Sequence, residues 1–198
     1  MREQLILASA SSYKKSLLRR LGVEFTTEPA DIDETPKANE LPEQLVMRLS
    51  EQKALAIAAI HKDSWVIGAD QAGSVTGKIL EKPGNHGKAF KQLQYQSGKN
   101  VHFHCGVTLA KQSSNGNITK FTNISTTEVI FRQLSDTEIN AYLEKEQPYD
   151  CAGSFKSEGL GISLFEQIKS NDPTCLIGLP LILVRKMLHK QGINNYNK

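Results

Sequence analysis

The sequence predicts a mixed α/β protein whose twisted sheet is flanked by helices. Short apolar strands alternate with amphipathic helices in the first half of the chain, and two long strand-like stretches form a hairpin in the second half. The 198 residues suffice to bury one sizeable core, and no repeat, low-complexity tract or linker interrupts them. We therefore expect residues 1–198 to form a single domain.

The first half reads as alternating strands and helices. Residues 5–7 are a compact apolar run, and after a turn of small residues a helix continues up to Gly22. We expect a short strand over residues 24–28 and a helix from Pro42 to about residue 61. The stripe expected to face the core on this helix is Leu45, Leu49, Ala56 and Ile60. Residues 65–67 predict another buried strand, with the sequence GADQ at its carboxyl end.

The second half carries clear turn and capping signals. Asn85 can cap a helix that runs through Gln96 and ends before Gly98. The strand-like stretches 101–111 and 118–132 are joined by Asn115-Gly116-Asn117, which is typical of a hairpin. The last two helices are expected from a capping box at Ser135 and Glu138 to about Lys145, and from Pro180 to near Gln191.

The composition argues against several classes of function. The formal charge of +3 is too small, and the basic residues too scattered, to indicate a nucleic-acid partner. No apolar run reaches the length of a membrane span or a signal-peptide core, so we expect a cytoplasmic protein without a membrane partner. Cys105, Cys151 and Cys175 lack the spacing of a zinc site or a disulfide framework. The oligomeric state stays open, a homodimer included.

Residues 9–15, SASSYKK, indicate an anion site. Small residues and hydroxyls at a helix start leave backbone N–H groups free, and the lysines in its first turn oppose the helix dipole unless an anion is bound. The alternative is an ordinary capped surface helix.

Two carboxylates indicate a metal site. Glu34 lies on a loop stiffened by Pro36, and Asp70 follows a buried strand. Two such groups can hold a hard cation such as Mg²⁺ between the protein and a phosphate. Each of them can also be read as a cap or a solvated loop charge.

Lysines that converge on these carboxylates would suit a triphosphate. Lys53 falls on the inward side of its helix, Lys82 precedes a proline, and Lys156 lies in the glycine-rich loop 151–161. Solvent-exposed lysines and a simple tight turn are the alternatives. His102 and His104 face the same side of a strand but lack a third metal ligand, so we interpret them as structural.

Several motifs in order resemble the Maf family of nucleotide pyrophosphatases. They are LILASASSYK, DETP, the inward Lys53, GADQ, EKP, AGSFKSEGLGI and NDPTCLIGLPL. The resemblance implies a fold like that of inosine triphosphate pyrophosphatases and a divalent cofactor, Mg²⁺ or Mn²⁺. It implies that Asp70 is the catalytic proton acceptor, that Glu34 and Asp70 hold the metal, and that four residues bind phosphate: Ser9, Lys14, Lys53 and Lys82. Lys14 and Lys15 replace the usual paired arginines, which removes the bidentate fork.

Within this family, the chain looks most like the branch that acts on 7-methyl-GTP. The resemblance rests on Tyr13, Gln71 and Glu158, which differ from the residues typical of the branch acting on dTTP and UTP. The dTTP/UTP activity is the second interpretation. A third is a non-catalytic nucleotide-binding regulator of septum formation, and the retained Asp70 and Glu34 favour catalysis over it.

Overall fold

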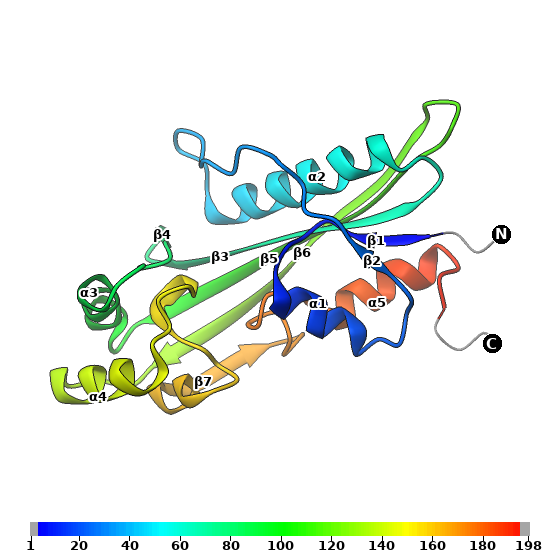
Figure 1. The fold of residues 1–198 in the computed structure, drawn as a ribbon. Coiled ribbons are helices and arrows are strands. Elements are labelled where there is room, and N and C mark those ends of the chain that lie inside the picture. Colours follow the sequence, from blue (N-terminus) through cyan, green and yellow to red (C-terminus); the bar gives the residue numbers. More distant parts are fainter. Residues whose placement is uncertain (1–3, 195–198) are drawn as a thin grey trace.

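The structure, a computed structural model, describes residues 4–194 and contains a seven-stranded mixed sheet (Figure 1). The strand order is β2-β1-β3-β5-β6-β7, and β4 pairs with the far end of β3 on the same edge as β1. β1 is parallel to β2 and β3, whereas the remaining pairs are antiparallel. The strands are β1 (Leu5–Leu7), β2 (Thr26–Thr27), β3 (Trp65–Val75), β4 (Lys78–Leu80), β5 (Asn100–Gln112), β6 (Ile118–Phe131) and β7 (Phe165–Ser170).

Five α-helices and two short 3₁₀ turns accompany the described sheet. They are α1 (Ser12–Arg19), α2 (Pro42–Ile60), α3 (His86–Gln96), α4 (Asp136–Glu146), α5 (Leu181–Lys190), η1 (Ala152–Ser154) and η2 (Leu160–Leu164). Helix α2 lies along one face of the long strands, and α1 and α5 lie on the other face near β1 and β2 (Figure 1). Helices α3 and α4 lie at the opposite end. The predicted fold class, a mixed sheet flanked by helices, is confirmed.

Successive side chains along a strand point to opposite faces of the sheet, so the strands contribute to the core on both faces. Ile6 and Val66 point toward α2, where they pack with Ile57. Their neighbours Leu7 and Ile67 point the other way and pack in a cluster with residues of α1 and α5. A period of two in the strands is therefore what allows helices to cover both faces.

Two glycines let α2 approach the sheet closely. A Cβ atom at Gly68 would lie 2.1 Å from the carbonyl oxygen of Ser50, and one at Gly106 would lie 2.2 Å from that of Val46. No side chain fits at either position while the helix stays where it is. The helix is also held by a buried hydrogen bond of 3.0 Å between Ser50 and Thr108. This close contact brings Lys53, one turn further along α2, down onto β3.

The loop after α4 is anchored by an aromatic cluster. The ring of Phe155 is 5.1 Å from that of Phe103 and 4.9 Å from that of Phe165, centroid to centroid. Gly153 has a φ of 79°, a conformation that suits glycine, and its carbonyl accepts a hydrogen bond of 2.8 Å from Gln96 of α3. The loop is therefore held in one position where it passes the centre of the molecule.

Some expectations drawn from the sequence are wrong in detail. Asp70 does not lie at the carboxyl end of a strand, because β3 continues to Val75 through its pairing with β5; glycine and aspartate are poor strand formers and suggested an earlier end. Ile60 is 67% exposed, so it does not belong to the core stripe of α2. The buried face of this helix shifts from Leu45 at its start to Ala58 at its end, since the sheet beneath it twists.

The strand expected over residues 24–28 is reduced to the two residues of β2. The predicted hairpin, formed by β5 and β6, and the predicted helices α3, α4 and α5 are confirmed within a few residues. β4 and β7 were not predicted. The expectation of a single domain over residues 1–198 extends beyond the described residues and stays a prediction.

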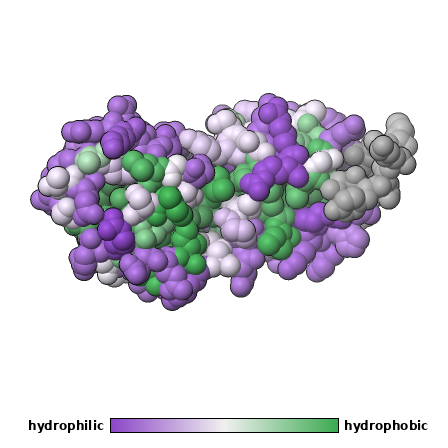
Figure 2. Space-filling view, turned by 90° about the horizontal axis from the view of Figure 1, so that it is seen from below, coloured by the Kyte–Doolittle hydropathy of each residue, from purple (hydrophilic) through white to green (hydrophobic). Residues whose placement is uncertain are grey.

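One face of the molecule is mainly polar (Figure 2). Seen from below, hydrophilic residues surround a broken apolar band along the middle (Figure 2). Within residues 4–194, no helix combines the length and apolar character that a membrane crossing requires.

Candidate active site

The site begins at a gap along one edge of β3. On one side, β3 pairs with β5 from Val66 to Val75; on the other, it pairs with β1 at residues 65–67 and with β4 at residues 73–75. Within the described chain, residues 68–72 have no partner strand on this second edge. Trp65 N–H and Ile67 C=O are bonded toward β1, so every second residue of β3 turns its main-chain groups that way. The main-chain groups of Ala69 and Gln71 therefore point into the gap.

A cleft of about 750 Å³ opens at this gap and collects the predicted site residues from distant parts of the chain. Its walls come from the turn before α1, the loop before α2, α2 itself, β3, the turn after β4 and the loop before η2. The nine predicted residues all line it: Ser9, Tyr13, Lys14, Glu34, Lys53, Asp70, Gln71, Lys82 and Glu158.

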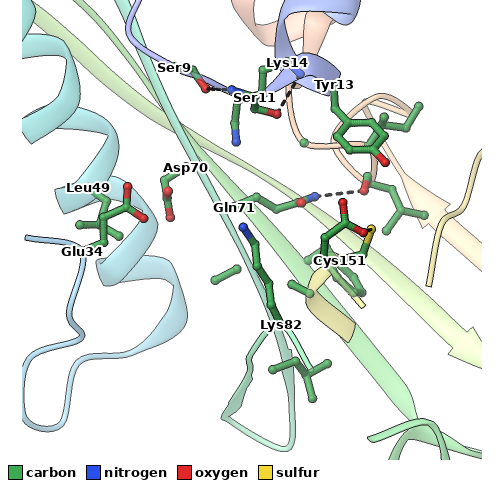
Figure 3. Close-up of a pocket in the computed structure, with 18 of the residues that line it drawn as sticks. Ser9, Ser11, Tyr13, Lys14, Glu34, Leu49, Asp70, Gln71, Lys82 and Cys151 are labelled. Atoms are coloured by element: carbon green, nitrogen blue, oxygen red, sulfur yellow. Dashed lines mark hydrogen bonds between the residues drawn. The ribbon is translucent and has the colours of Figure 1, made fainter. Parts of the chain in front are cut away.

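Asp70 and Glu34 face each other across one end of the cleft (Figure 3). Lys53 lies between them, with its Nζ 2.6 Å from Asp70 Oδ1 and 2.8 Å from Glu34 Oε1. Burial alone would lower the pKa of Lys53, but the charges of Asp70 and Glu34 and their hydrogen bonds outweigh it and raise that pKa above its usual range. The lysine is therefore held as a cation between two carboxylates.

The loop that carries Glu34 is clamped by Arg48 of α2. The guanidinium group binds both carboxylate oxygens of Glu40, at 2.6 and 2.7 Å, and donates to the carbonyl of Thr35 at 3.1 Å. The hydrogen bonds from Arg48 lower the pKa of Glu40 to about 2. The bidentate pair with Glu40 and the bond to Thr35 thus hold the backbone of the loop that carries Glu34.

The turn before α1 forms the adjacent wall. Ser9 Oγ accepts a hydrogen bond of 3.1 Å from Ser11 N–H, and Ser11 Oγ caps the helix by accepting from Lys14 N–H at 3.3 Å. The first turn of α1 contains no acidic residue. Burial lowers the pKa of Lys14, and attraction by Asp70 partly opposes this shift.

Lys82 enters the cleft from the turn after β4. Its side chain points toward Asp70 and Gln71 (Figure 3). Lys53 and Lys82 are both close enough to Lys14 to lower its pKa. Three lysines and a helix start thus converge where Asp70 and Glu34 lie, an arrangement suited to a polyphosphate.

The other end of the cleft carries different chemistry. Tyr13 is 38% exposed, and its charged neighbours are Asp150, Lys156 and Glu158. Gln71 uses its amide nitrogen to bind the carbonyls of Cys175 and Leu176, at 2.8 and 3.0 Å. Its Oε1 atom is left as an acceptor. An aromatic ring, two carboxylates and an amide oxygen can bind a planar base that is rich in donors.

Asp70 and Glu34 fit a hard divalent cation. Both offer only oxygen ligands, and both converge on one point that already holds a positive charge, the Lys53 ammonium group. No group of three or more His, Cys, Asp or Glu side chains suited to a metal occurs within residues 4–194. The protein therefore offers two carboxylates here, and phosphate oxygens and water would complete the coordination.

Comparison with known proteins identifies the family. The profile of a family described as "Maf-like protein" matches residues 4–191 of this chain. The chain belongs to the Maf family. A protein of Xanthomonas oryzae pv. oryzae named 7-methyl-GTP pyrophosphatase is 45% identical over 98% of this chain and 99% of its own length. A protein of the same name from Cupriavidus metallidurans is 48% identical over 96% of this chain and 94% of its own length.

Solved structures give a weaker likeness. The Ham1 protein of Staphylococcus aureus is 12% identical, with a TM-score of 0.46 over 96% of this chain and all of its own. A HAM1 protein of Coxiella burnetii is 16% identical, with a TM-score of 0.43 over 65% of this chain and 73% of its own.

Other candidates in this Maf chain lie outside the cleft. The rings of His102 and His104 stack on one side of β5 with centroids 6.1 Å apart. His104 is buried, which lowers its pKa, and its Nδ1 lies 3.0 Å from Thr126 Oγ1. Cys105 and Cys175 are buried free thiols. The structural interpretation of the histidines agrees with this environment.

The sequence analysis gave no site role to Asp150 or Cys151, which line the cleft near Tyr13. Burial raises the pKa of the Cys151 thiol to about 12, so the thiol stays protonated. Their closeness to the glycine-rich loop was the available signal, but no local pattern shows that residues 150 and 13 meet.

Proposed function

We propose that this protein hydrolyses 7-methyl-GTP to 7-methyl-GMP and pyrophosphate in the cytoplasm, with Mg²⁺ or Mn²⁺ as cofactor. The observation that carries the proposal is the cleft with two chemically different ends: lysines and two carboxylates at one, an aromatic ring and acidic groups at the other. The names of the similar proteins from Xanthomonas and Cupriavidus support it.

The triphosphate binds at the lysine end. Ser9, the free N–H groups at the start of α1, and the ammonium groups of Lys14, Lys53 and Lys82 neutralise and orient it. Glu34 and Asp70 would hold the divalent cation, which supplies Lewis-acid stabilisation of phosphate charge when bound.

Asp70 is the general base. In the absence of nucleotide, Lys53 donates to its Oδ1 atom at 2.6 Å, and Oδ2 is the oxygen that accepts the proton. Water loses this proton as its oxygen attacks the α-phosphorus. The bond between the α-phosphorus and the bridging oxygen breaks, and pyrophosphate leaves with the bonding electron pair.

The base is recognised at the other end. Methylation at N7 puts a delocalised positive charge on guanine, and the ring of Tyr13 can attract it through a cation–π contact worth roughly 0.5–2 kcal/mol. Glu158 accepts hydrogen bonds from the donors on the Watson–Crick edge, and Asp150 adds a second negative charge nearby. Uracil and thymine place carbonyl acceptors on either side of a single donor, so they fit this acidic end poorly.

The test is a panel of 7-methyl-GTP, GTP, dTTP and UTP with Mg²⁺, in which pyrophosphate and orthophosphate are measured separately. We expect pyrophosphate, the highest kcat/KM for 7-methyl-GTP, and complete loss of activity with EDTA. Orthophosphate with a diphosphate product would mean attack at the γ-phosphorus and would contradict the proposal. A preference for dTTP or UTP would contradict the base assignment alone.

A further inference from the structure

Lys53 occupies an unusual position for a phosphate-binding lysine. Its ammonium group forms two short ion pairs, at 2.6 Å with Asp70 and at 2.8 Å with Glu34, and its side chain is only 11% exposed. These are the same two carboxylates that the proposed reaction assigns to the divalent cation. The lysine charge thus lies at the point on which both potential metal ligands converge.

Two features hold this arrangement. Because Gly68 and Gly106 carry no side chain, α2 packs directly on the sheet, and the backbone of Lys53 can move away only if this close packing is broken. Arg48 clamps the loop that carries Glu34 through Glu40 and the Thr35 carbonyl. Lys53 is therefore the buried partner of the two ion pairs, with 11% of its side chain exposed, whereas the Glu34 side chain is 58% exposed and free to turn away from it.

The positive charges around Asp70 and Glu34 oppose the binding of a metal ion on its own. Two carboxylates and one ammonium leave a net charge of −1, and a divalent cation bound between the carboxylates would come into contact with Lys53. Lys14 and Lys82 add positive charge in the same cleft. A triphosphate reverses this balance, because it brings several negative charges and offers Lys53 new acceptors.

We infer that Lys53 takes the place of the divalent cation while the cleft is free of nucleotide, so that the metal enters only together with the triphosphate. On binding, the ammonium group exchanges the two carboxylates for phosphate oxygens, and the carboxylates become free to bind the metal. The inference rests on the proposed function in assigning Asp70 and Glu34 to the metal.

The test measures Mn²⁺ binding to the full chain without nucleotide at pH 8. Electron paramagnetic resonance gives the concentration of free Mn²⁺. Lys53→Met removes the charge and keeps the length of the side chain, and we expect it to bind Mn²⁺ at least tenfold more tightly than the wild type. Lys53→Arg keeps the charge and should bind as weakly as the wild type. Adding Glu34→Gln to Lys53→Met should abolish the gain, because the gained site needs both carboxylates.

Thermal unfolding shows which variants are folded. If Lys53→Met does not fold, Lys53→Gln takes its place as the neutral variant. Equal Mn²⁺ affinity in the wild type and a folded neutral variant overturns the inference. That result leaves the proposed function intact if the wild type still releases pyrophosphate. If the neutral variant binds Mn²⁺ more tightly but the wild type releases no pyrophosphate, the inference stands and the proposed reaction fails.

Discussion

The contact between Gly68 and α2 predicts a large effect from a very small change, Gly68→Ala. The added Cβ atom would lie 2.1 Å from Ser50 O and 2.6 Å from Ala54 N, against an ordinary contact of at least 3.4 Å. Both atoms belong to the backbone of α2, so the helix must retreat by roughly 1 Å because no side-chain rotation can relieve the overlap. Lys53 moves with the helix, and its 2.6 Å contact with Asp70 is lost or lengthened.

Two measurements follow from this displacement. Overpacking of a close-packed interface costs about 1–3 kcal/mol of unfolding free energy, and each kcal/mol lowers Tm by about 2–4 °C in a chain of this size. A shift of about 1 Å at a catalytic group costs on the order of 100-fold in rate, so we expect kcat/KM for 7-methyl-GTP to fall by about that factor.

Gly87→Ala is the matched control. Gly87 lies in α3, and an added Cβ atom would meet nothing closer than 3.8 Å. We expect wild-type activity and an unchanged or slightly raised Tm. If Gly68→Ala has the Tm and kcat/KM of the wild type, the close approach of α2 does not position Lys53 and the reasoning is refuted.

Three further predictions concern catalysis, specificity and pH. Asp70→Asn should keep the wild-type Tm within a few degrees and lose nearly all turnover; near-normal turnover in a folded variant would remove Asp70 from the mechanism. Glu158→Gln should reduce the preference for 7-methyl-GTP over GTP, measured as the ratio of kcat/KM values, and an unchanged ratio would show that Glu158 is a solvated loop charge. Because the hydrogen bonds from Arg48 lower the pKa of Glu40 from 4.5 to about 2, the carboxylate stabilises the fold above pH 4.5 and this contribution is lost as the pH falls toward 2. Glu40→Gln should therefore be less stable than the wild type at pH 6 in urea unfolding, and the difference should shrink below pH 4.5; a difference that is constant with pH would contradict the clamp.

Local signals in the sequence predicted the elements whose boundaries depend on neighbouring residues. The cap at Asn85, the capping box at Ser135 and the turn at Asn115-Gly116-Asn117 are each recognisable within a few positions, and the structure contains them. The end of β3 was missed because Gly68 and Asp70 are poor strand formers, whereas the strand is maintained by pairing with β5. Strand propensity depends on the residues of one segment, whereas sheet pairing depends on two segments that are distant in the sequence.

In the site, too, individual residues were predicted from the sequence, whereas the contacts between them were not. The residue types of Ser9, Lys14 and Asp70 suggested phosphate chemistry, and the family resemblance directed attention to Gln71 and Glu158. Neither source indicated that Lys53 bridges Asp70 and Glu34, or that Arg48 holds the loop that carries Glu34. These relations depend on how closely α2 lies against the sheet, which becomes predictable only when Gly68 and Gly106 are seen to face the helix.

The gap beside β3 has a consequence for how this protein can change by mutation. The N–H and C=O groups of Ala69 and Gln71 that point into it belong to the main chain, so almost no amino-acid replacement can remove them; only proline deletes the N–H. At Gln71, which lines the cleft, these hydrogen-bonding groups stay the same whatever side chain stands there. Tyr13 and Glu158 at the rim of the cleft act through their side chains. A single substitution at either position therefore changes the charge or shape of the rim. If the rim selects the base as proposed, substitutions there can change the choice of base while the main-chain groups of Gln71 stay the same.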